Sequence, residues 1–176
     1  MPPRRRGLTF FELSVVLMIM AALAAVAVPH FAQTLQARNA RHAAIQLADY
    51  VDYIRNTAIN EGRSASLSVD PNSDRFWSVD VDFPDQPGVP ISVLVKDRFE
   101  DRLEITASFD DATTLTFDLE GTPTVGGTPL GDGVIVIDAI AVAYEVRIGT
   151  GPGRASIVEV EPESPAQASQ TQSSGS

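Results

Sequence analysis

The longest apolar run of the chain extends from Leu8 to Val28 and contains only three polar residues, Thr9, Glu12 and Ser14. A helix rises ~1.5 Å per residue, so this run would be about 31 Å long, close to the thickness of the hydrocarbon core of a bilayer. We therefore predict a membrane-spanning helix over residues 8–29. Arginines at positions 4–6 precede it, which favours a cytoplasmic N-terminus and places the rest of the chain on the other side, the periplasm in a bacterium.

Residues 30–62 carry a different pattern, in which small and apolar residues recur at spacings of three and four. Such spacing places them on one stripe of a helix, with the charged residues directed elsewhere. Pro29 lacks a backbone donor and is expected to kink the helix, and Glu61-Gly62 is expected to end it. The stripe comprises Ala37, Ala40, Ala44, Leu47, Ala48, Val51, Ile54 and Ala58, and the residues expected to point largely away from it are Arg38, Arg41, Asp49, Asp52 and Arg55.

Beyond Gly62 the apolar period falls to two, which is typical of short strands. We therefore predict an α+β fold in which an antiparallel β domain, residues 63–160, packs on the amphipathic half of the helix. Within it, Trp77 is expected to be in the core and the preceding Phe76 on the opposite face. Residues 161–176 are rich in Pro, Ser, Gln and Glu and are expected to form a disordered tail. The predicted strands are 64–70, 76–81, 90–96, 103–109, 113–119, 133–139, 141–148 and 154–160, with turns at 70–74, 84–90, 110–111 and 121–133.

The composition narrows the functional classes. The 176 residues suffice for one globular domain with an appendage, and they include no cysteine, so neither disulfides nor thiolate metal sites can form. The formal net charge is −10, which repels phosphate backbones and argues against general nucleic-acid binding. Neither His30 nor His42 has a nucleophile or a metal-ligand pattern nearby, so we predict no enzyme activity, no catalytic site and no cofactor.

Asp70, Asn72 and Asp74 alternate as the first ligands of a calcium-binding loop do. In such a loop, however, a glycine belongs where Arg75 stands and a bidentate glutamate where Val81 stands. We therefore interpret residues 70–74 as a turn between two strands and keep calcium binding as the weaker alternative.

Residues 4–29 resemble the class III signal of type IV pilins and type II secretion pseudopilins: a short basic leader ends in Gly7, an apolar helix follows, and Glu12 is the fifth residue after that glycine. Leu8 departs from the phenylalanine that is commonest in its position. The resemblance implies that a prepilin peptidase removes the leader, residues 1–7, by cutting between Gly7 and Leu8, and methylates the new amino group of Leu8. It also implies that the helix bends at Pro29 and that Glu12 meets the Leu8 amine of a neighbouring subunit, which fixes the register of the helices in a filament.

The later part of the chain is similar to the GspH/FimT branch of minor pseudopilins and minor pilins. The similarity rests on residues 48–70, on Phe76-Trp77, on the sequence FDLEGTPT at 117–124 and on a late Gly-Arg at 153–154. It implies a minor pseudopilin of a type II secretion system, a single-pass protein of the bacterial inner membrane with its C-terminal domain in the periplasm. The implied partners are the prepilin peptidase, the major pseudopilin and other minor pseudopilins, the inner-membrane secretion platform and the secreted cargo, with no nucleic acid.

Two alternatives stay open. A FimT-like minor type IV pilin would act in pilus assembly or DNA uptake, although here Gly153-Arg154 is followed by Ala155, Ser156 and then acidic residues, without a second arginine. An ordinary secretory signal peptide would be cut after Ala27 and release a soluble protein. The acidic Glu12 inside the apolar run argues against that second alternative, as does the helical pattern that continues past the supposed cut.

Overall fold

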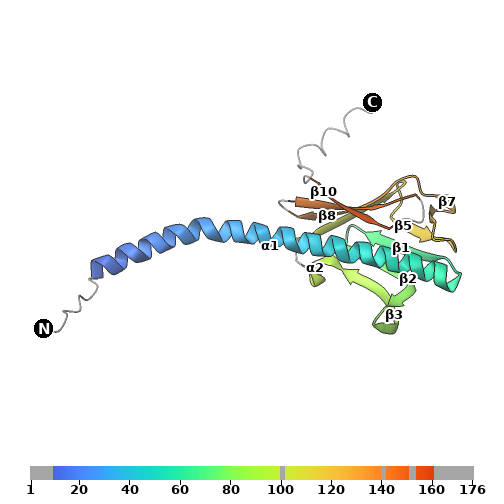
Figure 1. Cartoon of the computed structure of the whole chain (residues 1–176), viewed down its shortest axis with the longest axis horizontal. Helices are drawn as coiled ribbons and strands as arrows, with labels where there is room; N and C mark the ends of the chain where they lie inside the picture. Colours follow the sequence, from blue (N-terminus) through green and yellow to red (C-terminus); the bar gives the residue numbers. More distant parts are fainter. Residues whose placement is uncertain (1–9, 100–101, 140–141, 151–153, 161–176) are drawn as a thin grey trace, which may run out of the picture. The chain divides into compact units, whose positions relative to one another are not determined.

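The structure, a computed structural model, describes residues 10–99, 102–139, 142–150 and 154–160, without the side chains of Val26, Val28, Pro29 and His30. One long helix, α1 (Phe10–Glu61), opens the described chain, and antiparallel strands follow it (Figure 1). The chain divides into two compact units, Met1–Leu35 and Gln36–Ser176, so α1 contributes residues to both. The second unit is the β domain together with the last part of α1.

The described strands of the β domain form two antiparallel sheets. The six-stranded sheet has the order β3-β2-β1-β5-β6-β7, and the four-stranded sheet has the order β10-β9-β8-β4. The short helix α2 (Val95–Arg98) lies between β3 and β4 in the chain. The strands of the larger sheet are β1 (Ala65–Asp70), β2 (Arg75–Phe83), β3 (Gln86–Leu94), β5 (Thr114–Phe117), β6 (Pro123–Val125) and β7 (Thr128–Pro129), and those of the smaller sheet are β4 (Glu104–Phe109), β8 (Gly133–Ala139), β9 (Val142–Ile148) and β10 (Ser156–Val160).

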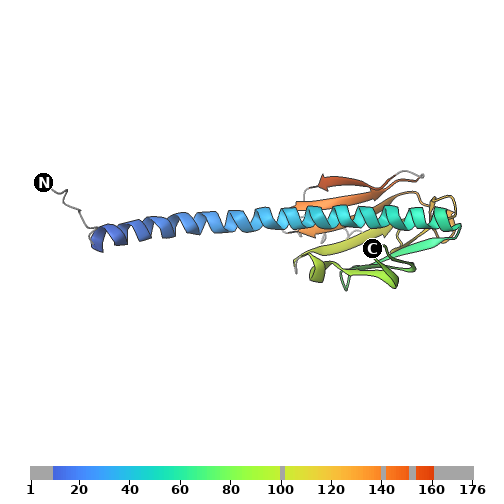
Figure 2. The ribbon, with the colours of Figure 1, turned by 60° about the horizontal axis from the view of Figure 1, so that its bottom comes forward.

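The part of α1 that belongs to the β domain lies across both sheets (Figures 1 and 2). Its buried side chains form one core with the inward residues of the strands, because β1 and β8 each bury every second side chain. The apolar stripe predicted for this part of the helix is therefore confirmed. Its fully buried members are Ala40, Ala44, Leu47, Val51, Ile54 and Ala58.

The two sheets are joined at Asp74, which precedes β2 and is 4 % exposed. Its carboxylate accepts a hydrogen bond of 3.0 Å from the backbone N–H of Ile105 in β4 and lies 2.6 Å from the Nζ of Lys96 in α2. Its carbonyl oxygen accepts a further bond from the N–H of Val95. Asp74 has a φ of +49°, a region that aspartate tolerates better than most residues. One buried carboxylate thus connects the β1–β2 turn, α2 and β4.

The predicted α+β class with an antiparallel β domain is confirmed, but several details of the prediction are wrong. Phe76, at 1 % exposed, is in the core, whereas Trp77 is half-buried on the other face under the guanidinium of Arg75, 5.2 Å from its ring centroid. The predicted strand 90–96 ends at Leu94, because Val95 begins α2, and β3 starts inside the predicted turn 84–90. The short strands β6 and β7 lie within the predicted turn 121–133. The tail 161–176 lies outside the described residues.

Candidate functional site

The first part of α1 presents apolar side chains that no other described element covers. Every described side chain between Phe10 and Leu35 is exposed. The large ones include Phe10, Met18 and Phe31, at 87 %, 77 % and 72 % exposed. An apolar surface of this extent marks a site that binds another protein or a lipid environment.

Glu12 lies in the first turn of α1 and is exposed. It is the one Asp, Glu, Lys or Arg in the sequence of residues 10–35. The nearby hydroxyl of Ser14 is used within the helix, where it donates to the carbonyl oxygens of Phe10 (2.8 Å) and Phe11 (3.0 Å). Glu12 therefore gives this apolar segment its only formal charge, a negative one.

The structure describes only some of the other residues that the sequence predicts to be functional in this region. Gly7 and Leu8, the predicted cleavage site, lie outside the described residues. Pro29 lies within α1 but its side chain is not described, so the kink stays a prediction. Across the described residues, no helix is both long enough and apolar enough to span a membrane. The span over residues 8–29 also stays a prediction.

Within the β domain, α1 carries a buried charged side chain that the sequence pattern predicted to lie away from the apolar stripe. Arg55 was expected to point away from the apolar stripe, yet its side chain is only 3 % exposed. Its Nη1 donates to Asp52 Oδ1 over 3.3 Å, and its guanidinium carbon lies 5.0 Å from the centroid of the Phe117 ring. Burial lowers the pKa of Arg55, and the carboxylate of Asp52 partly offsets this effect. A cation over an aromatic face is attractive, so β5 stabilises this part of α1 through Phe117.

The sequence FDLEGTPT contains the turn between β5 and β6, which lies against the helix at Gly121. Asp118 Oδ1 accepts hydrogen bonds from the N–H groups of Glu120 (2.9 Å) and Thr122 (2.8 Å). Gly121 has a φ of +77°, and a Cβ atom on it would lie 2.6 Å from Cδ1 of Ile59. Only a glycine allows so close an approach in this backbone conformation. The motif used to relate the chain to the GspH/FimT branch therefore has a structural role, as a clamp on α1.

Asp52 also connects α1 to the end of the domain. Its Oδ1 accepts a hydrogen bond of 3.0 Å from the N–H of Ala155, and its Oδ2 lies 3.9 Å from Nε of Arg154. The late Gly-Arg motif thus supplies a cation that pairs with the helix. Its guanidinium is not withdrawn from solvent, since the Arg154 side chain is 93 % exposed.

The calcium candidate receives no support from the geometry. Asp70 accepts hydrogen bonds from Asn72 and Ser73 and closes the turn, and these bonds lower its pKa, that from Ser73 most strongly. Asp74 is directed inward, to Lys96 and Ile105. In the described part of the chain, no three His, Cys, Asp or Glu side chains are placed to hold a metal ion. The structure does not bring Asp70, Asn72 and Asp74 together as a ligand set.

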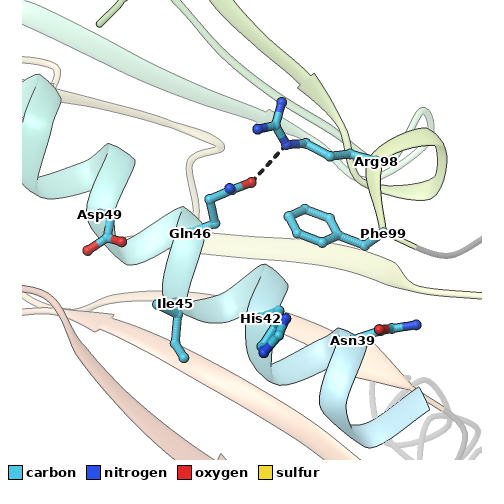
Figure 3. A pocket seen from close by; sticks show the side chains of 7 residues that line it. All are labelled: Asn39, His42, Ile45, Gln46, Asp49, Arg98 and Phe99. Atoms are coloured by element: carbon cyan, nitrogen blue, oxygen red, sulfur yellow. Dashed lines mark hydrogen bonds between the residues drawn. The ribbon is translucent and has the colours of Figure 1, made fainter. Parts of the chain in front are cut away.

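A hollow of about 490 Å³ lies between α1 and the residues that end α2 (Figure 3). Gln46 and Arg98 point toward each other across it, and Arg98 Nε donates to Gln46 Oε1 over 2.8 Å. His42 and Asp49 line it from the helix and Phe99 from the opposite side. Its described lining residues include no serine, threonine, cysteine or lysine.

Comparisons with known proteins identify the fold. No family model matches the sequence, and no curated protein matches it. The type IV minor pilin FimU of Pseudomonas aeruginosa matches with a TM-score of 0.52 at 17% sequence identity, over 72% of this chain and 95% of that one. The minor pseudopilin EpsH from the Type 2 Secretion System of Vibrio cholerae matches with a TM-score of 0.48 at 12% identity, over 72% and 99%. The match to FimU shows that the chain has a type IV pilin-like fold, as the sequence predicted.

Proposed function

We propose that this chain is a minor subunit of a type IV pilus-like filament, with the first part of α1 in the filament core and the β domain outside it. The observation that carries the proposal is the exposed apolar surface of residues 10–35, in a chain whose β domain already has a complete core of its own. Helices of neighbouring subunits would cover this surface. Before assembly, residues 8–29 would be held in the bacterial inner membrane with the β domain in the periplasm.

In this proposal Glu12 sets the stagger between subunits. A carboxylate within a bilayer costs about 2.5–3.5 kcal/mol on insertion scales, so a partner is required. Cleavage after Gly7 would create an amine on Leu8, and two opposite charges ~4 Å apart attract by roughly 4 kcal/mol at an effective dielectric constant of 20, before desolvation is subtracted. A helix placed in the wrong register would leave both charges without this contact. Cleavage would therefore have to precede assembly.

The host machine that we propose is a type II secretion system, in which the subunit would join a short periplasmic pseudopilus that helps to push folded proteins across the outer membrane. Its partners would be the prepilin peptidase, the major and other minor pseudopilins, and the inner-membrane platform. A minor pilin of a type IV pilus is the second candidate, because FimU carries that name and the same fold. DNA uptake is disfavoured by the formal net charge of −10 and by the acidic residues that follow Gly153-Arg154 in place of a second arginine.

The decisive experiment is Glu12→Gln in cells that hold the complete apparatus and lack the native copy. We expect the amount of this subunit in sheared filaments to fall about tenfold, which corresponds to ~1.4 kcal/mol, while its level in the membrane stays the same. Ser14→Ala is the matched control, because it removes a polar group two residues away without changing charge. Normal incorporation of Glu12→Gln, with unchanged secretion, would refute the role of Glu12.

A second measurement tests the processing step. The intact mass of the protein extracted from membranes should correspond to a chain that begins at N-methylated Leu8. A chain that begins at Val28 would instead support an ordinary signal peptide and exclude the filament role.

A further inference from the structure

Strand β2 bulges away from its neighbour β3 at one place in the six-stranded sheet. Residues 78–81 of β2 lie opposite a single residue of β3, Ile91. The register pairs on either side of this bulge are Trp77–Ser92 and Asp82–Pro90. Within the bulge the side chain of Val79 is 69 % exposed, whereas Ser78 and Val81 are buried. Bulges re-aim side chains and are over-represented at sheet edges and beside functional sites, and this one directs Val79 toward solvent.

The bulge is braced by Asp80. Its carboxylate oxygen Oδ2 accepts hydrogen bonds from the N–H of Ser66 in β1, over 2.8 Å, and from the hydroxyl of Ser66. Its carbonyl oxygen accepts a bond from the guanidinium of Arg63, and its own N–H donates to Ser78 Oγ over 3.3 Å. Val79 is therefore presented to solvent by a constrained segment, so little conformational entropy would be lost when another protein covers it.

Trp77 lies beside Val79 on the outer face of the sheet, because the buried Ser78 separates the two residues along the strand. It is half-buried, and the guanidinium carbon of Arg75 lies 5.2 Å from its ring centroid. Tryptophan and arginine are both enriched in protein–protein interfaces. β2 and the edge strand β3 lie at the lower border of the β domain in Figure 1. Trp77 and Val79 thus form an apolar patch at this border, the β2 patch.

The charges next to the β2 patch are negative. Residues 76–95 contain three aspartates and no lysine, arginine or histidine. Asp80 is engaged in the bulge, whereas Asp82 and Asp85 are exposed, and no salt bridge within the described residues involves either of these two. The flanking cations have contacts within the chain: Arg63 with Glu61, Arg75 with Trp77 and Ser92, and Lys96 with Asp74. Asp82 and Asp85 therefore favour a cationic surface on the partner.

We propose that the β2 patch docks a different subunit of the filament, one that offers an apolar pocket for Val79 and a Lys or Arg opposite Asp82 and Asp85. Burial of Val79 and Trp77 would supply the affinity, and the two aspartates would orient the partner. A second copy of this chain is disfavoured, because it would bring the same aspartates and a further net charge of −10. The inference rests on the proposed function, since the filament supplies the partner.

The reactivity of a single thiol tests whether the patch is covered. The native chain has no cysteine, so Val79→Cys places one thiol in the patch, and Leu119→Cys is the matched control at a residue that is 59 % exposed between β5 and β6. Each full-length variant is treated with a maleimide dye, in detergent and in sheared filaments. We expect the thiol at position 79 to react about tenfold more slowly in filaments, and the thiol at position 119 less than about twofold more slowly. Equal rates in both states at position 79 would overturn the docking surface.

Val79→Asp tests whether docking matters for assembly. We expect its amount in sheared filaments to fall about tenfold, and that of the control Leu119→Asp less than about twofold. Urea unfolding should give the wild-type midpoint for both variants, because both side chains are largely exposed, so misfolding would not explain the loss. A normal amount of Val79→Asp would overturn the inference and leave the filament role intact. Absence of the wild-type chain from filaments would instead refute the filament role, and the inference with it.

Asp85→Lys tests the chemistry of the partner, and Glu120→Lys makes the same change at another exposed position. We expect incorporation of Asp85→Lys to fall about fivefold and that of Glu120→Lys less than about twofold. Equal incorporation of the two variants would exclude a cationic partner surface. Oxidation of filaments that contain Val79→Cys tests for a second copy, because two such patches in contact would form a disulfide dimer. A dimer would overturn the assignment to a different subunit.

Discussion

The guanidinium carbon of Arg55 in α1 lies 5.0 Å from the centroid of the Phe117 ring in β5. This contact joins two residues that are far apart in the sequence, and it keeps a charged side chain in a position that is 3 % exposed. Such a position is tolerated because Asp52 supplies the opposite charge one helical turn earlier. Arg55 and Phe117 therefore contribute to the packing of α1 on the sheet, and the Arg55 guanidinium is not part of the solvated surface of the helix.

Asp52→Ala should lower the free energy of unfolding by about 2 kcal/mol, because it leaves a buried cation without this carboxylate and removes the acceptor for the N–H of Ala155. The loss should be smaller than for a fully buried pair, since Asp52 is itself partly solvated. Urea unfolding followed by the fluorescence of Trp77 measures it. The matched control is Asp49→Ala at an exposed position of the same helix, with an expected change under about 0.5 kcal/mol. Equal effects of the two substitutions would show that the Arg55 contact contributes little.

Gly121→Ala should destabilise the β domain by about 2–3 kcal/mol, because the new methyl group would meet the Ile59 side chain and the backbone has a positive φ. Gly126→Ala has a similar φ, +59°, but nothing within 4 Å, so it should show the backbone cost alone, about 1 kcal/mol. Thermal unfolding of both variants separates the two causes. Ile59→Ala should partly rescue Gly121→Ala, and a failure to do so would mean that the clamp on α1 does not depend on this contact.

The fall in the free energy of unfolding at alkaline pH should depend on Tyr144. Burial raises the pKa of this phenol above its ordinary value, and the negative charge of Glu159 adds to the effect. The unfolded chain releases the phenol proton at about pH 10, before the folded chain does. The stabilising contribution of Tyr144 is therefore fully present below that pH and is lost as the pH rises to the pKa of the folded state. Tyr144→Phe should therefore flatten the fall in unfolding free energy between about pH 8 and about pH 11. Glu159→Gln should lower the pKa of Tyr144 in a phenolate absorbance titration, and an unchanged curve would contradict the assigned cause.

The sequence alone was sufficient to predict the features that depend on a regular local spacing of apolar residues. The stripe from Ala40 to Ala58 and the alternation within strands such as β8 reflect the periods of a helix and of a strand, so the α+β fold was predictable. The placement of Trp77 was not, because alternation assigns Phe76 and Trp77 to opposite faces without saying which face is inward. The four-residue α2 and the two-residue β7 are too short for a pattern, and prolines and glycines around β7 resemble a loop.

The candidate site, like the fold, could be predicted only where the signal is local in the sequence. Glu12 was singled out because a charge interrupts an apolar run, which is a local signal. The burial of Arg55 depends on Phe117, 62 residues further along the chain, and no spacing within the helix encodes that contact. The nearest local signal was Gly121 in the FDLEGTPT sequence. A glycine permits both a positive φ and the close approach of another side chain, here that of Ile59.

The single carboxylate of Asp74, shared between Ile105 and Lys96, has a consequence for how the domain opens. A sheet whose edge is capped by a side chain from its neighbour cannot fray there without exposing a buried anion. Local, partial unfolding of β4 or of α2 should therefore be rare, and amide protons at this junction should exchange only when the whole domain opens. The two sheets would then behave as one cooperative unit, a useful property for a domain that would have to stay folded under mechanical load.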